Sequence, residues 1–367
     1  MKFTKSLIAT SVLAAAATAS AKTTMTIDGE AFYQTSTLKS ENDAFAISNI
    51  DGDVDTASGL KVEGTFLSFD SEWEGFNTYV ELMPVAGMGV GVSQLNVTTS
   101  HMGGKLDVKF GLQSDMIGGM HDFGILYANS DGDFTEAISA TYKLAQGNVS
   151  LLLGNTPDAY YYGQFANAGG VVIADDEGNP VPYNMEEADT AKWMAAGPFM
   201  GLVYDATYGA LDVLASYHSR TVPEYKTTVV ELESASQTWM ALGLGYTMGK
   251  TVAGFDYTTE TQGATVEGDD DTVITGMLLK VSHDLGMVVP TFSYMTSNKV
   301  TGDADTATTM MELDVTYNAG KDYDWFFAYQ TSTVDQLTDG AGNDVEDDAL
   351  TTTSMMLGAT FSASQAM

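Results

Sequence analysis

Apolar and polar residues alternate with a period of two along most of this chain. From Met311 to Asn318, every odd-numbered residue is apolar or aromatic and every even-numbered residue is polar. The same alternation recurs in 106–113, 211–220 and 240–248. Because successive side chains of a β-strand point to opposite faces, each segment predicts a strand with one apolar face and one polar or small face. We therefore expect an all-β chain.

The breaks in this alternation are of two lengths. Short breaks lie at 146–148, 209, 249–250, 285–286 and 319–321, and long acidic breaks lie near 38–58, 115–135, 158–198, 222–236, 261–272, 298–307 and 333–349. Between them we expect about sixteen strands, near 23–37, 59–73, 76–86, 89–101, 105–114, 136–145, 147–156, 198–208, 210–221, 237–248, 251–261, 272–284, 287–297, 308–318, 323–332 and 350–361. Hairpins with short connections at one end and long ones at the other are typical of transmembrane antiparallel up-and-down β-barrels, with short periplasmic turns and long outer loops.

A soluble β-sandwich would also alternate, but its exposed face usually carries charge. Here the apolar faces end in aromatic side chains, at Tyr217, Tyr246, Tyr257, Tyr294, Tyr317, Tyr323, Trp325 and Tyr329. Such rings are enriched where a barrel meets the two membrane interfaces. The opposite faces carry glycines, which favour an open lumen over a packed core, at Gly111, Gly243, Gly245, Gly254, Gly276 and Gly358.

Composition narrows the class of protein further. The 367 residues include 49 acidic and 15 basic side chains and no cysteine. The absence of cysteine excludes disulfide frameworks and thiolate metal sites, and the acidic balance argues against binding of nucleic acid. Residues 1–21 carry two lysines, an apolar run and Ala19-Ser20-Ala21, which is the pattern of a secretory signal peptide. Its removal would leave 22–367 as a single barrel domain with 13 bases against 49 acids, a net charge of −36.

The sequence offers no basis for catalysis or for a cofactor. It has no nucleophile elbow, no phosphate-binding loop and no zinc-protease motif, and its four histidines lack metal-ligand spacing. The Asp-rich stretch from Asp51 fails the calcium-loop pattern because Thr56 and Val62 stand where glycine and glutamate are needed. Acidic runs at 131–133, 269–271 and 346–348 are typical of solvated loops. The alternative for these runs is weak binding of divalent cations that bridge the phosphates of lipopolysaccharide.

Several segments, in the same order, are similar to strands of a known family. Thr26–Ala31, Ser58–Gly64, Leu106–Gln113 and Met356–Phe361 resemble the first, second, fifth and closing strands of the general diffusion porins of Gram-negative outer membranes. The resemblance implies an outer-membrane location, a homotrimer, and a loop after the fifth strand that folds into the barrel. The chain departs from the family in having six residues after Phe361 and a single arginine, Arg220.

The resemblance implies that loop 115–135 brings acidic side chains to a pore constriction, namely Asp115, Asp122, Asp131 and Asp133. Alternation places Lys61 and Lys109 opposite them, and it places four more charges on the lumen wall, namely Arg220, Lys280, Glu312 and Asp314. Opposed charges across a narrow gap filter solutes by size and charge, and an acidic lumen concentrates cations. We thus expect a cation-preferring channel for passive diffusion of small hydrophilic solutes. The alternative is an exported acidic surface-layer or adhesive β-protein without a pore.

Overall fold

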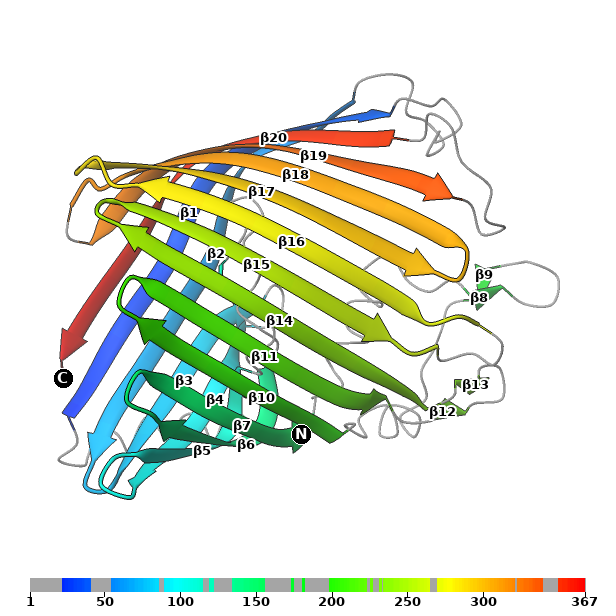
Figure 1. Cartoon of the computed structure of the whole chain (residues 1–367). Helices are drawn as coiled ribbons and strands as arrows, with labels where there is room; N and C mark the ends of the chain where they lie inside the picture. The colour runs from blue at the N-terminus through cyan, green and yellow to red at the C-terminus, as the bar shows by residue number, and fades with distance from the viewer. Residues whose placement is uncertain are drawn as a thin grey trace.

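The computed structural model describes most of the chain after residue 21, and the strands and turns it describes form a barrel. The described residues are 22–40, 54–85, 89–114, 119–121, 134–155, 173–174, 180–181, 198–222, 225–226, 231–232, 234–264, 269–320, 322–338 and 349–366. Within them, sixteen strands form one closed antiparallel barrel, shown in Figure 1. The proposed signal peptide lies outside the described residues.

The barrel strands follow one another in chain order around the wall. They are β1 (Lys22–Ser40), β2 (Val54–Trp73), β3 (Phe76–Val85), β4 (Gly89–His101), β5 (Leu106–Ser114), β6 (Phe134–Lys143), β7 (Gly147–Asn155), β10 (Pro198–Tyr208), β11 (Leu211–Val222), β14 (Ala235–Met248), β15 (Thr251–Gln262), β16 (Thr272–His283), β17 (Val288–Thr301), β18 (Ala304–Tyr317), β19 (Tyr323–Thr338) and β20 (Ala349–Ala366). β20 pairs with β1 and closes the barrel. The predicted fold class and approximate strand number are thus confirmed.

The two ends of the barrel differ as the breaks in alternation predict. At one end, on the left in Figure 1, neighbouring strands join through tight turns. Gly209 and Gly249 have φ angles of +69° and +62° in two of these turns, a conformation that glycine adopts without a steric penalty. At the other end, two small two-stranded sheets lie in the long connections: β8 (Ile173–Ala174) with β9 (Pro180–Val181), and β12 (Tyr225–Lys226) with β13 (Glu231–Leu232).

One predicted long loop is wrong. The sequence predicts an acidic loop at 298–307, but β17 continues to Thr301 and β18 begins at Ala304. Gly302, at a φ of +56°, and Asp303 alone form the connection. Threonines and Val300 in this segment favour extended backbone, and one glycine at positive φ suffices for a tight hairpin.

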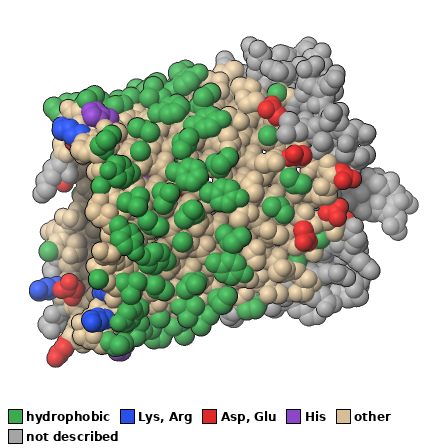
Figure 2. Space-filling view, in the orientation of Figure 1, with side chains coloured by type: hydrophobic (Ala, Val, Ile, Leu, Met, Phe, Trp, Pro, Cys, Tyr) green, Lys and Arg blue, Asp and Glu red, His purple; other side chains and the backbone are tan. Residues whose placement is uncertain are grey.

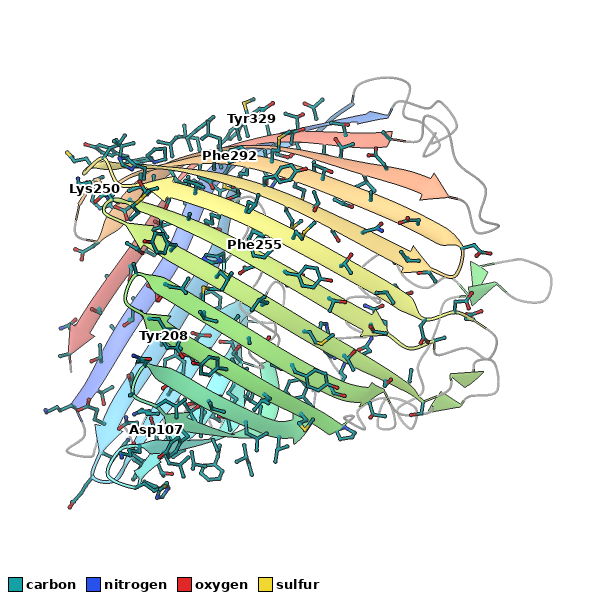
Figure 3. All side chains as sticks on the ribbon, in the orientation of Figure 1. Asp107, Tyr208, Lys250, Phe255, Phe292 and Tyr329 are labelled. Atoms are coloured by element: carbon teal, nitrogen blue, oxygen red, sulfur yellow. The ribbon has the colours of Figure 1, made fainter. Side chains whose placement is uncertain are left out.

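The outer surface of the barrel is apolar. Leucine, methionine and aromatic side chains are exposed over it, and Figure 2 shows them as a broad hydrophobic area, with acidic side chains toward the end that carries the long connections. Phe292 and Tyr329 are 47% and 41% exposed on this surface, and Tyr208 lies near the turn end (Figure 3). Of the predicted aromatic set, most rings are exposed, and Tyr294 is half-buried. An apolar exterior is the arrangement that a lipid environment requires of a barrel.

The closing strand extends beyond the predicted end at Phe361. Residues 362–366 continue β20 and pair with β1, from Asp28 opposite Ser362 to Thr24 opposite Ala366. On the inner side of this seam, Phe32, Phe326, Ala328 and Met356 form a buried apolar cluster. Residues 362–366 are therefore part of the wall.

Among the described residues, no helix is long and apolar enough to span a membrane.

Candidate pore lining

Charged side chains alternate with exposed apolar side chains along β16 and β18. Leu279 and Val281 are 51% and 44% exposed on the outer face, so Lys280 between them points inward. By the same alternation with Met311 and Leu313, Glu312 and Asp314 of β18 point inward. Gln330 of β19 donates a hydrogen bond of 2.7 Å from Nε2 to Glu312 Oε2. The inner wall over β16–β18 therefore carries the carboxylates of Glu312 and Asp314 and the ammonium group of Lys280.

Arg220 lies on the inner wall of β11. Its Nε donates a hydrogen bond to Gln237 Oε1, and its guanidinium carbon lies 4.9 Å from the centroid of the Trp239 ring. Both partners come from β14, the neighbouring strand. The hydrogen bond and the cation–π contact together fix the orientation of this guanidinium group.

Lys109 lies on β5, next to the exposed Phe110 of the outer face, and its half-buried side chain points to the inner side. Two residues earlier, Asp107 forms a 2.7 Å ion pair with Lys143 of β6. Lys61 is in register with Phe32 of β1, and its side chain lies outside the described residues. The predicted constriction acids also lie outside the described residues, namely Asp115, Asp122, Asp131 and Asp133.

A short segment of the connection between β5 and β6 lies inside the barrel. Of this connection the structure describes Gly119, Met120 and His121, which we call the inner segment. It contacts the inner faces of β14 and β15, although β7, β10 and β11 separate β6 from β14 around the wall. These contacts place the inner segment within the lumen, as the resemblance implied for this loop.

Asp256 of β15 holds the inner segment through two contacts. The backbone N–H of His121 donates to Asp256 Oδ2 at 2.7 Å, and His121 Nδ1 lies 3.0 Å from Asp256 Oδ1. Asp256 is only 3% exposed. Sequence reasoning did not select either residue as a site. The alternation of Asp256 with Phe255 and Tyr257 was the available signal that its carboxylate points inward.

Three glycines provide the space that the inner segment occupies. Gly243 and Gly245 of β14 and Gly254 of β15 form a surface without side chains, which we call the glycine notch. A Cβ atom at Gly243 would lie 2.4 Å from Met120 Cβ, and one at Gly254 would lie 2.5 Å from His121 Nε2. The sequence predicts that these inward glycines line a lumen, and in the structure the inner segment lies in the lumen against them.

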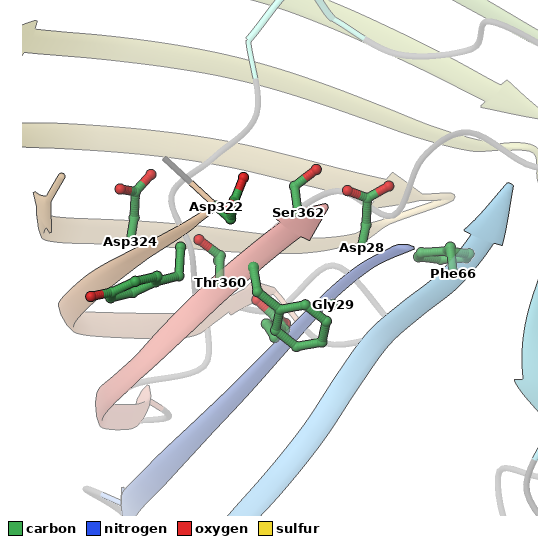
Figure 4. A pocket seen from close by; sticks show the side chains of 10 residues that line it. Asp28, Gly29, Phe66, Asp322, Asp324, Thr360 and Ser362 are labelled. Atoms are coloured by element: carbon green, nitrogen blue, oxygen red, sulfur yellow. The ribbon is translucent and has the colours of Figure 1, made fainter. Parts of the chain in front are cut away.

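A pocket of about 410 Å³ opens at the turn end of the seam, between β1, β2, β19 and β20. Four carboxylates line it, from Asp28, Glu30, Asp322 and Asp324. Figure 4 shows Asp28, Asp324 and Ser362 on the same side of the strands. Within the described residues, no group of three or more histidine, aspartate or glutamate side chains is arranged to hold a metal ion. The pocket adds negative charge to this end of the barrel.

Comparison with known proteins identifies the fold. No protein-family model matches the chain, and no curated protein matches it by sequence. Among solved structures, OmpT of Vibrio cholerae, an outer membrane protein in its trimer form, has a TM-score of 0.62 at 14% identity over 93% of this chain and 99% of that one. An anion-selective porin of Comamonas acidovorans has a TM-score of 0.60 at 10% identity over 94% and 100%. The outer membrane channel DcaP of Acinetobacter baumannii has a TM-score of 0.58 at 11% identity over 93% and 96%. The chain has the fold of outer-membrane porins.

Proposed function

We propose that this protein forms a water-filled channel in the outer membrane through which small hydrophilic solutes diffuse passively, with cations preferred. The observation that carries the proposal is a closed sixteen-stranded barrel with an apolar exterior, inward-pointing charges and a loop segment inside it. A barrel of this strand number surrounds enough space for an aqueous channel.

Cation preference is supported by the sign of the charges. The chain carries a net charge of −34, and Asp256, Glu312 and Asp314 bring carboxylates to the inner wall. Carboxylates around a pore raise the local concentration of cations and repel anions. The anion-selective porin of similar fold indicates that such selectivity depends on the lining residues of each chain.

Location and assembly form part of the same proposal. The pattern of residues 1–21 supports export, and the apolar exterior supports insertion among membrane lipids and lipopolysaccharide. A homotrimer is supported by the likeness to OmpT of Vibrio cholerae, whose structure is of a trimer form. We propose no catalytic role, no metal site and no cofactor.

The deciding experiment is conductance of the purified protein in a planar lipid bilayer. We expect stepwise current increases and, under a potassium chloride gradient, a reversal potential that shows potassium to be more permeant than chloride. The preference should weaken between about 0.1 M and 1 M salt, because the screening length falls from about 10 Å to about 3 Å. Absence of current steps from folded protein would reject the channel, and equal or greater chloride permeability would reject the cation preference.

The hypothesis that competes with the proposed channel is a surface-layer or adhesive protein without a pore. Such a protein should be released from cells by chelator or denaturant, whereas a membrane barrel should require detergent. The exposed leucine and aromatic side chains of the barrel wall favour the membrane-inserted form.

A further inference from the structure

We propose that His121 and Asp256 form a pH-dependent latch that holds the inner segment in the glycine notch and thereby steadies the channel. This inference rests on the proposed function, and it assigns Asp256 as a positioning residue that acts through the inner segment.

The geometry favours a latch over a chance contact. Asp256 uses both carboxylate oxygens on one residue, His121, at 2.7 Å to its backbone N–H and 3.0 Å to its Nδ1. Hydrogen bonds to an ionised group are stronger than those between neutral groups, and two bonds from one carboxylate fix the orientation of the segment. Both oxygens lie on β15, five strands around the wall from β6, so the contact ties the middle of the connection to a distant part of the wall.

The glycine notch makes the position of the inner segment specific. At Gly243 an added methyl group would overlap Met120 Cβ, and at Gly254 it would overlap the His121 ring. At Gly245 the same methyl group would lie 3.4 Å from its nearest neighbours, which is an ordinary contact. The notch therefore provides a graded test, in which Gly243→Ala expels the segment and Gly245→Ala leaves it in place.

The pairing of the His121 imidazole with the Asp256 carboxylate makes the latch sensitive to pH. On the wall it faces Asp256 of β15, Asp212 of β11, which adjoins Gly245, and Lys280 of β16, which is in register with Gly254. The neighbouring acids of its own connection, Asp115 and Asp122, lie outside the described residues. Histidine changes its charge between pH 5 and 8, whereas aspartate and lysine ordinarily keep theirs. An imidazolium group pairs more strongly with a carboxylate than a neutral imidazole does, so the latch is tightest at low pH.

A unique cysteine reports the position of the inner segment without any measurement of current. Because the chain has no cysteine, Met120→Cys provides a single thiol. In folded protein in detergent at pH 6, we expect a water-soluble thiol reagent to modify this residue about tenfold faster, or more, when Asp256→Asn or Gly243→Ala is added. Gly245→Ala should leave the rate unchanged. Migration of unheated samples in gels verifies folding, and Asp256→Asn keeps the proposal falsifiable if Gly243→Ala does not fold.

Bilayer recordings then test the pH dependence. We expect the open wild-type channel to show more current fluctuation at pH 8 than at pH 5, and this difference to be absent in His121→Gln and in Asp256→Asn. Glu312→Gln removes another carboxylate of the inner wall and should keep the difference. Equal thiol reactivity in all variants, or a pH dependence that persists in His121→Gln, would overturn the latch. A folded protein that gives no current would instead reject the proposed function, and the thiol rates would still decide on the latch.

Discussion

Gln330 of β19 and Glu312 of β18 are joined by a 2.7 Å hydrogen bond on the inner wall of the barrel. The two residues are in register on neighbouring strands, and Glu312 is 1% exposed. A side-chain amide that donates to a carboxylate holds its position without neutralising its charge. Glu312 therefore contributes a fixed negative charge to the wall.

This fixed charge predicts an effect on selectivity. We expect Glu312→Gln to lower the ratio of potassium to chloride permeability, because one carboxylate of the lining is removed while the shape of the side chain is kept. The reversal potential under a potassium chloride gradient measures the effect. Glu74→Gln, at an exposed turn between β2 and β3, is the matched control and should leave the ratio close to the wild-type value.

The loop between β5 and β6 predicts effects on both the cation preference and the conductance of the proposed channel. We expect Asp115→Asn with Asp122→Asn to reduce cation preference, and deletion of 117–128 to raise single-channel conductance, because the deletion removes the inner segment from the lumen. Single-channel recordings measure both. If these changes leave conductance and selectivity as in the wild type while a deletion within 158–198 alters them, the constriction lies in that longer connection instead.

The apolar outer surface predicts a cost for charge if the barrel is inserted in a membrane as proposed. Leu279 is 51% exposed on the outer face of β16, and Leu279→Arg should destabilise the folded barrel by about 2–4 kcal/mol if the position lies near the middle of the bilayer. Met248, 67% exposed at the turn end of β14, provides the control, and Met248→Arg should cost about 0–1 kcal/mol. Urea titration of the protein folded in lipid vesicles measures the difference. Similar costs at the two positions would contradict a membrane-spanning orientation of β16.

The last strand predicts that residues 362–366 stabilise the closed barrel. Their removal deletes the pairing with Thr24–Asp28 of β1, and each lost backbone hydrogen bond is worth about 1 kcal/mol. We expect the truncated protein to lose its folded gel migration at a lower temperature than the full chain. A shortened chain that ends at Phe361 and melts at the wild-type temperature would show that the seam does not depend on these residues.

The sequence by itself determined the strands and their two faces. A period of two is a local property of the chain, so Met311–Asn318 and 240–248 could be recognised as strands with apolar residues on one side. The short turns that contain glycine could also be placed between strands. Alternation also indicated which side of a strand Lys280, Glu312 and Asp314 occupy. It failed at 298–307, where acidic and small residues suggested a loop although a single glycine turn was enough.

Only the tertiary structure decided which residues meet. His121 and Asp256 are 135 positions apart, and no local pattern relates a histidine in a loop to an inward carboxylate five strands around the wall from β6. Gly243 and Gly254 show the same limit, because a glycine on the inner face fits an empty lumen and a packed loop equally well until the neighbouring atoms are known. The pairing of 362–366 with β1 likewise depends on closure of the sheet, which joins the two ends of the chain. The local chemistry of the chain fixes the faces of its strands, and closure of the barrel fixes what those faces touch.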